Sequence, residues 1–298
     1  MEQLCIVAYV FGGYTPFIPF YVYSVLKSYP DYFVKIYVHE QLPEKEKICL
    51  ELVRQRGYDR FQIVENYRDV ILAKQPNGIN DNKVLKVLRW LLPYEEFKDF
   101  DYVYIGDIDY LIIREEPPLL QGHLQHCAQT GLPYSNMIRK NNSRRLSGLH
   151  FFKVKEYYKK MNDIINYYAN NLEALLQLLS QYQKSPNESF LYHIVSQGIG
   201  VTEKIEDGRE YHYRPDHGFH LGNIRDGIVR RDGCLLHYQN NKELIAYCHD
   251  ETMCAMLHIL PVKEIIYLFY HLVEKPRLTL KVKAYKLLWD LCNMTKKL

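Results

Sequence analysis

The sequence predicts an α/β fold in which strands alternate with helices, followed by a helical appendage at the C-terminus. Residues 4–64 alternate three apolar runs with two amphipathic stretches, and this succession is typical of parallel strands joined by right-handed crossovers. The chain has 298 residues and no internal repeat or low-complexity segment. We therefore expect one α/β domain over residues 1–245 and a helical appendage over residues 246–298.

The first elements follow from the N-terminal residues. Leu4–Phe11 is a continuous apolar run closed by two glycines, which is typical of a buried strand. A helix is expected over Pro16–Tyr29 and a second strand over Tyr32–His39. Pro43–Gly57 begins with proline and two glutamates and ends in glycine, as helix start and stop signals do. Phe61–Val64 is then a short third strand.

A further helix is expected over Lys83–Leu92, after a polar, glycine-containing loop that supplies capping residues. Apolar residues recur at helical spacing and predict its buried stripe, which consists of Val84, Leu88, Leu91 and Leu92. The basic residues of the segment are expected together on the other side, and they are Lys83, Lys86 and Arg89.

The remaining elements follow in chain order. Apolar segments predict strands over Tyr102–Ile105, Tyr110–Ile113 and Leu149–Val154. Helical periodicity covers Lys155–Gln183 and then Asn187–Gln197. Residues 203–238 are expected to be loop and strand, and the rest of the chain mostly helical.

Composition excludes several classes of protein. The seven cysteines are scattered without a Cys-x-x-Cys pair, which favours neither a disulfide framework nor a zinc site and fits a reducing compartment. No apolar run reaches 18 residues and the N-terminus lacks a basic, secretory-type start. We therefore expect a cytoplasmic protein without a membrane span.

Charge is distributed unevenly along the chain. Lys275–Leu298 carries a net charge of +6, and because the whole chain carries +3, the rest carries −3. A slightly acidic body argues against a nucleic-acid partner. The tail interleaves lysines with leucines and a tryptophan, which favours peripheral contact with the anionic inner face of a membrane. An amphipathic helix packed on the domain is the alternative.

The strongest chemical signal is Asp107-Ile108-Asp109, directly after the apolar segment Tyr102–Ile105. Ligands of open α/β sheets gather beyond the carboxyl ends of strands. Two carboxylates separated by one residue at such an end can share a hard divalent cation, Mn²⁺ or Mg²⁺, which would bridge the phosphates of a nucleotide diphosphate. A plain surface turn is the alternative, but apolar residues flank the pair on both sides.

The stretch VLKVLRWLLPYEEFKDFDYVYIGDIDYLII, residues 84–113, resembles the core of the family-8 retaining glycosyltransferases. The resemblance implies a GT-A-like, Rossmann-type mixed sheet flanked by helices, so that residues 1–245 would be a nucleotide-sugar-binding catalytic domain. It also implies a UDP-sugar donor, Mn²⁺ (or Mg²⁺) and transfer of a hexose with retention. The acceptor would be a glycan or a lipid-linked glycan, as in bacterial-type polysaccharide synthesis.

Residue by residue, the resemblance makes Asp107 and Asp109 metal ligands and Arg89 a catalytic basic residue. Asn187-Glu188 resembles the family's Asp-Gln pair beside the donor sugar, with the carboxylate moved to Glu188, whereas Leu146 stands where the family has Asn. Nucleotide contacts are expected along the end of the first strand, the basic helix and the Asp-Ile-Asp motif, from Ala8, Tyr9, Gly12, Tyr14, Lys83, Arg89, Asp107, Ile108 and Asp109. At Gly12 to Tyr14, a plain strand-to-helix turn is the alternative.

Two histidines compete for the third metal ligand that the resemblance implies. His237 follows a short apolar run and has Lys242 after it, which resembles the family's order. His220 lies in a glycine-flanked segment with Arg225 following, which suits a loop that closes over phosphates. We expect His220, with His237 as the alternative.

Three other functions are weighed against this one. An inverting transferase would need a carboxylate base, for which Glu188 or Asp250 is available. An aspartate-based phosphatase usually has Asp-x-Asp-x-Thr, but Leu111 occupies the threonine position. A non-catalytic sugar-binding module is the remaining possibility.

Overall fold

The computed structural model describes residues 2–67, 82–139, 144–202, 205, 218–225, 228–229, 238–284 and 286–287. Its centre is a six-stranded sheet in the order β3-β2-β1-β4-β7-β6. The four strands β3 (Phe61–Val64), β2 (Phe33–Val38), β1 (Leu4–Val10) and β4 (Tyr102–Ile105) are parallel. At the other edge, β7 (His150–Lys153) runs antiparallel to both β4 and β6 (Tyr134–Ser135). The expected mixed sheet is therefore confirmed.

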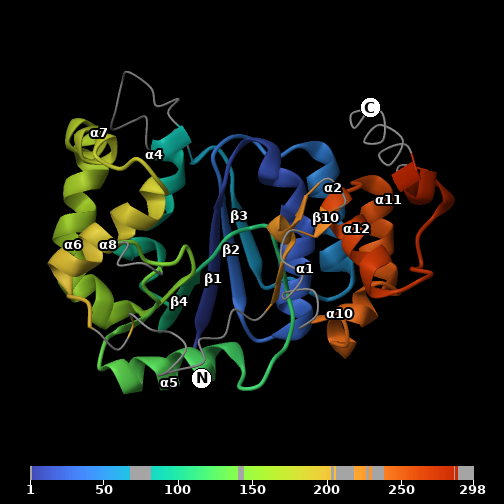
Figure 1. Ribbon diagram of the computed structural model, residues 1–298, viewed down its shortest axis with the longest axis horizontal. Coiled ribbons are helices and arrows are strands. Elements are labelled where there is room, and N and C mark those ends of the chain that lie inside the picture. Colours follow the sequence, from blue (N-terminus) through green and yellow to red (C-terminus); the bar gives the residue numbers. More distant parts are fainter. Residues whose placement is uncertain are drawn as a thin grey trace.

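Helices cover both faces of this sheet (Figure 1). On one side lie α1 (Ile18–Ser28), α2 (Glu44–Gln55), α10 (Lys242–Tyr247), α11 (Glu251–Ile259) and α12 (Lys263–Leu272). On the other lie α4 (Asn82–Val87), α6 (Val154–Asn170), α7 (Leu172–Ser180) and α8 (Pro186–Gly198). Helix α5 (Leu119–Thr130) lies below the sheet in the same view. The predicted fold class, α/β with helices at the C-terminus, is confirmed.

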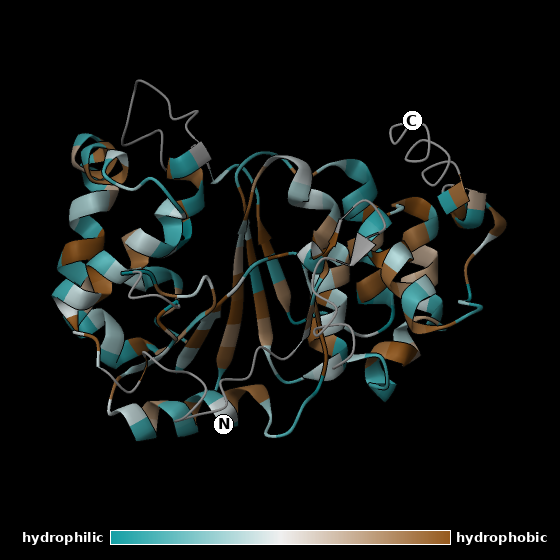
Figure 2. Ribbon diagram, viewed as in Figure 1, coloured by the Kyte–Doolittle hydropathy of each residue, from teal (hydrophilic) through white to brown (hydrophobic). Residues whose placement is uncertain are grey.

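Strand β1 shows why its sequence is apolar without interruption. Its side chains alternate between two cores: Leu4, Ile6 and Ala8 pack toward α1, whereas Cys5 and Val7 pack toward the α6–α8 side. A strand buried on both faces has no solvent-facing positions to fill with polar residues. Figure 2 shows the same contrast between apolar central strands and helices with hydrophilic outer residues.

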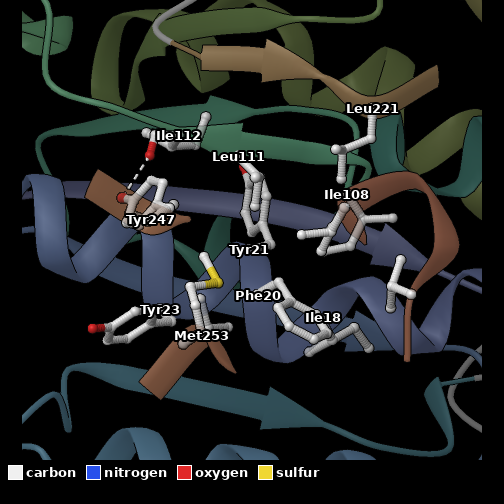
Figure 3. Close-up of a cluster of buried hydrophobic side chains, with 14 of the residues drawn as sticks. Ile18, Phe20, Tyr21, Tyr23, Ile108, Leu111, Ile112, Leu221, Tyr247 and Met253 are labelled. Carbon is white, nitrogen blue, oxygen red and sulfur yellow. Dashed lines mark hydrogen bonds between the residues drawn. The ribbon is translucent and has the colours of Figure 1, made fainter. Parts of the chain in front are cut away.

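The C-terminal helices share a core with the sheet. Figure 3 shows Tyr247 of α10 and Met253 of α11 among Phe20, Leu111 and Ile112, and the Tyr247 hydroxyl donates a 3.0 Å hydrogen bond to the carbonyl of Ile112. The expected boundary between residues 245 and 246 falls inside α10. Buried contacts join the two parts. The division into a domain and an appendage stays a prediction.

Several expected elements differ in detail. The long helix expected over residues 155–183 divides at Asn171, whose side chain caps α7 by accepting a hydrogen bond from the amide of Ala174. Helix α5 and strand β6 were not predicted. The helix expected over residues 83–92 ends at Val87 and continues as a 3₁₀ turn, η2 (Leu88–Trp90).

That 3₁₀ turn corrects the expected position of Arg89. A tighter helical period rotates the residues that follow Val87, so Arg89 is buried rather than on the exposed side with Lys83 and Lys86.

No helix in the described part of the chain is long and apolar enough to cross a membrane.

Candidate active site

A cavity of about 250 Å³ opens at the carboxyl ends of β1 and β4. One part of its wall is apolar or aromatic and is formed by Tyr9, Val10, Phe11, Tyr14, Leu85 and Ile108. The other part carries charged and polar groups, namely Lys86, Arg89, Asp107, Asp109, Asn187 and His220. These residues come from five parts of the chain that the sheet and its flanking helices bring together.

Asp107 is held by a buried arginine. Arg89 Nη1 donates to Asp107 Oδ1 at 2.5 Å and lies 3.4 Å from the carbonyl oxygen of Gly106. The guanidinium also stacks over the Trp90 ring, with 4.4 Å from Cζ to the ring centroid. Charge pairing and ring contact together offset the cost of burying this cation.

Gly148 completes the contact between Arg89 and Asp107. A Cβ atom at this position would lie 2.9 Å from Arg89 Nη2 and 3.4 Å from Asp107 Oδ2. The backbone therefore approaches the ion pair more closely than any side chain would permit. Arg89 Nε is buried and has no hydrogen-bond partner among the described residues.

Asp109 and His220 meet through a second, two-stranded sheet. Strand β5 (Tyr110–Ile112) pairs antiparallel with β8 (Gly218–His220), and Tyr110 is directly opposite His220. His220 Nε2 lies 3.1 Å from Asp109 Oδ2, and the rings of Tyr110 and His220 stack at 4.6 Å. A Cβ atom at Gly222 would lie 2.8 Å from His220 Nε2. Backbone pairing and ring stacking thus fix the imidazole beside the carboxylate.

The donor set of the cavity fits a hard divalent cation. Carboxylate oxygens with one imidazole suit Mn²⁺ or Mg²⁺, with water or substrate oxygens completing the shell. In the described residues, no three His, Cys, Asp or Glu side chains are grouped closely enough to hold a metal by themselves. Asp109 and His220 form a ready pair, whereas Asp107 faces the same cavity but is engaged by Arg89.

The aromatic wall is anchored behind Tyr9. Its hydroxyl is hydrogen-bonded to His39 Nδ1 at 2.6 Å, and its ring meets Tyr67 edge-on at 6.1 Å. Burial, and then the neighbouring Tyr67, raise the pKa of Tyr9 far above its usual value. Tyr9 therefore stays neutral at physiological pH. Tyr14, by contrast, is half exposed and free to cover a ligand.

Several expected site residues do not line the cavity. Ala8 is buried in the core on the α1 side of the sheet, Gly12 begins the 3₁₀ helix η1 (Gly12–Phe17) with φ of +58°, and Lys83 is exposed on α4. The Glu188 carboxylate accepts hydrogen bonds from Arg139 rather than facing the cavity. His237 lies outside the described residues.

Sequence reasoning missed part of the wall. The sequence predicts Val10, Phe11 and Leu85 only as members of a strand and a helix, and it favours Glu188 over its neighbour Asn187 as a site residue. The run of apolar residues at the end of β1 was the available signal for the first two. The signal for Asn187 is its place in the Asn187-Glu188 pair, which lies in the first turn of α8 (Pro186–Gly198).

No family model matches the chain, and no curated protein matches it in sequence. Solved structures do. An active-site mutant of LgtC matches with a TM-score of 0.45 and 16% identity over 64% of this chain and 70% of that one. The galactosyltransferase LgtC in complex with donor and acceptor sugar analogs has a TM-score of 0.38 and 14% identity, over 66% and 84% of the two chains.

A third match is the glycosyltransferase GlyE of Streptococcus pneumoniae TIGR4, with a TM-score of 0.44 and 10% identity over 81% of this chain. The chain spans half the length of that protein. Each of these TM-scores is below 0.5.

Proposed function

We propose that the protein is a GT-A-type glycosyltransferase that moves a hexose from a UDP-sugar to a glycan or lipid-linked acceptor and depends on Mn²⁺ or Mg²⁺. The observation that carries this proposal is the composition of one cavity at the carboxyl edge of the sheet. An aromatic wall with Tyr9 and Tyr14 faces two carboxylates, an imidazole and two cations. A nucleotide diphosphate has the matching halves, a flat base and a charged diphosphate.

In this proposal each part of the wall has a separate task. The aromatic residues bind the base and ribose by stacking, as Tyr14 is free to do. Lys86 and Arg89 both line the cavity, and their cationic groups are donors for the diphosphate. Such fixed donors stabilise the charge that develops on a leaving phosphate without reorganising.

Asp107, Asp109 and His220 would hold the cation. A bound cation supplies neutralisation of the diphosphate as the sugar departs. Tyr110 orients the His220 ring by stacking, and Arg89 orients the Asp107 carboxylate through the 2.5 Å contact. These orientations exist before any ligand binds, which lowers the cost of assembling the site.

The surroundings of the acidic residues favour retention over inversion. An inverting transferase needs a carboxylate base beside the reacting carbon. Glu188 is engaged by Arg139, and Asp250 pairs with Lys27 at the start of α11. Among the described residues, the acids that line the cavity are Asp107 and Asp109, and both belong to the proposed cation site.

The test is thermal stabilisation of the full chain by a panel of nucleotide sugars, with and without Mn²⁺. A ligand at about 100 times its Kd stabilises by about 2.7 kcal/mol, which is a shift of roughly 5–10 °C for a chain of this size. We expect a UDP-sugar to give such a shift only with Mn²⁺ present, and slow donor hydrolysis to accompany it.

The alternatives give different results in the same experiment. A non-catalytic sugar-binding module would be stabilised without hydrolysing the donor. Absence of any Mn²⁺-dependent shift with uridine, guanosine and adenosine diphosphate sugars would contradict the proposed function itself.

Membrane contact through the basic tail is part of the proposal. In the described part of the tail, Leu278 and Val282 are buried, whereas Leu280 and Leu287 are exposed. Lys286 lies over the Tyr270 ring of α12 at 4.9 Å. The segment therefore packs on the C-terminal helices through one side and leaves leucines and lysines on the other, which is the arrangement that an interfacial helix requires.

A further inference from the structure

A cluster of two arginines and one glutamate lies at the start of α8. Arg139 Nε and Nη2 donate to Glu188 Oε1 at 2.9 Å and 2.7 Å. Arg145 Nη1 lies 3.6 Å from Glu188 Oε2, beyond hydrogen-bond distance, and donates instead to the Ser185 hydroxyl at 3.1 Å. The cluster therefore contains two guanidinium groups and one carboxylate.

This cluster lies close to the candidate active site. Glu188 directly follows Asn187, which lines the cavity. On the other side, Arg145 is three residues from Gly148, whose Cα packs against Arg89 and Asp107. Three residues span at most about 11 Å, and the amide of Leu146 is hydrogen-bonded to the carbonyl of Glu188 at 3.2 Å. The two arginines therefore lie close enough to the cavity for a single oligosaccharide to contact both.

Among the described residues, the cluster contains more positive than negative charge, and its arginines are partly open to solvent. The side chain of Glu188 is 12% exposed, whereas that of Arg139 is 44% exposed and that of Arg145 is 29% exposed. Arg144 and Lys184 are exposed beside them. A guanidinium carries five donors in a planar fork, and such forks bind carboxylates and phosphates through paired hydrogen bonds.

We propose that Arg139 and Arg145 form an anion-binding subsite that selects acceptors carrying a carboxylate or phosphate group. That the anion belongs to a glycan acceptor rests on the proposed function; that the site binds a carboxylate or phosphate group does not. Glu188 occupies the Arg139 fork in the absence of a ligand and competes with the ligand for it. The Glu188 carboxylate thereby lowers the affinity of the site for the acceptor's anion. In this proposal Glu188 is a competing anion and not a catalytic base.

The test measures glycan affinity by isothermal titration at low ionic strength on the full chain, without donor. Three probes are compared: a heparosan tetrasaccharide, which carries carboxylates, mannose 6-phosphate, and neutral maltotetraose. We expect one acidic probe to bind and maltotetraose to bind at least tenfold more weakly. Binding of the carboxylate probe alone or of the phosphate probe alone identifies which group the site takes.

Three variants assign the binding to the cluster. Arg139→Gln should weaken the acidic probe at least tenfold, because it removes the fork. Glu188→Gln should tighten it several-fold, because it removes the competing carboxylate. Arg54→Gln is the matched control, since Arg54 is 48% exposed and paired with Glu51 on the distant helix α2, and it should change affinity less than twofold. If Arg139→Gln lowers the melting temperature, Arg139→Lys replaces it, because lysine keeps the charge and loses the fork.

Opposite effects of the two substitutions on probe affinity distinguish an anion-binding role of the cluster from a purely structural role. A purely structural cluster predicts that Arg139→Gln and Glu188→Gln weaken the probe equally or not at all, and either result overturns the proposal, as does equal binding of acidic and neutral probes. The Mn²⁺-dependent shift with UDP-sugars is measured on the same samples. Loss of that shift with the acidic probe still bound contradicts the proposed function and leaves the subsite standing, and the reverse result removes the subsite alone.

Discussion

Asp250 joins the C-terminal helices to α1, and its substitution tests whether they fold as one unit with the sheet. The carboxylate caps α11 by accepting from the amide of Met253 at 2.8 Å. It also accepts from the Tyr23 hydroxyl at 2.9 Å and is paired with Lys27. Asparagine keeps the capping oxygen, so Asp250→Asn removes the charge and leaves the cap.

The expected loss follows from these contacts. A hydrogen bond to a charged group contributes about 1.5–3 kcal/mol, and the fully buried limit of 3–5 kcal/mol does not apply because the Lys27 side chain is 31% exposed. We expect Asp250→Asn to lower the free energy of unfolding by about 2 kcal/mol. Asp250→Ala should cost about 1 kcal/mol more, because it removes the cap as well.

The loss should depend on pH in a defined direction. Burial raises the pKa of Asp250, but hydrogen bonds from Lys27, the Met253 amide and Tyr23 lower it further than burial raises it, to below its usual 3.8. A group with a lowered pKa in the folded state stabilises above its ordinary pKa, and this contribution is lost as the pH falls through the folded-state value. The difference in the free energy of unfolding between the parent and Asp250→Asn should have its full value at neutral pH and become smaller below about pH 4.

The assay is urea unfolding followed by far-ultraviolet circular dichroism at several pH values. A difference under about 0.5 kcal/mol at neutral pH, the range of an exposed ion pair, would refute the reasoning. So would a difference that stays constant down to pH 2. If the C-terminal helices unfold in a separate transition in Asp250→Ala, they form an independent appendage and the shared core does not couple them to the sheet.

Three further predictions concern the proposed site and the tail. Asp109→Asn should weaken Mn²⁺-dependent UDP binding at least tenfold in calorimetry, because it removes a charge and little volume; equal affinity would contradict the metal assignment. His220→Ala should lose Mn²⁺ and UDP binding together, whereas His237→Ala should keep both, and the opposite pattern would transfer the role to His237. Replacing Lys281 and Lys283 with Gln should weaken binding to anionic vesicles, measured by sedimentation, roughly thirtyfold, since each of the two basic residues contributes about 1 kcal/mol near such a surface; unchanged binding at low salt would exclude membrane contact by this segment.

The sheet was predictable where a segment is apolar throughout. β1, β2 and β4 were predictable as strands because helices cover both of their faces. Helix α5 could not be read in this way, since its buried face is polar. His123 and His126 are both buried and both contact the Ser135 hydroxyl at 2.8 Å. Histidines at helical spacing do not by themselves predict a buried face. Their burial is explained only by the Ser135 hydroxyl of β6, which both of them contact.

The site was predictable where its chemistry is local in sequence and not elsewhere. Asp107 and Asp109 can be recognised from the sequence because they come soon after an apolar strand and are separated by a single residue. The surroundings of Arg89 and Glu188 depend on partners that are distant along the chain: Asp107 is 18 residues from Arg89, and Arg139 is 49 residues from Glu188. Helical periodicity describes only near neighbours, so it placed Arg89 on an exposed side and gave no sign that Glu188 is engaged.

The pairing of β5 with β8 makes the proposed site sensitive to the number of residues rather than to their kind. His220 meets Asp109 because Tyr110 is opposite His220 in that short ladder. In a strand, a shift of one residue turns every side chain to the opposite face. One residue added or removed between Gly218 and His220 would therefore turn the imidazole away from the cavity while leaving the main sheet untouched. Natural variation in chain length should avoid this tripeptide and gather in the connections on either side of it.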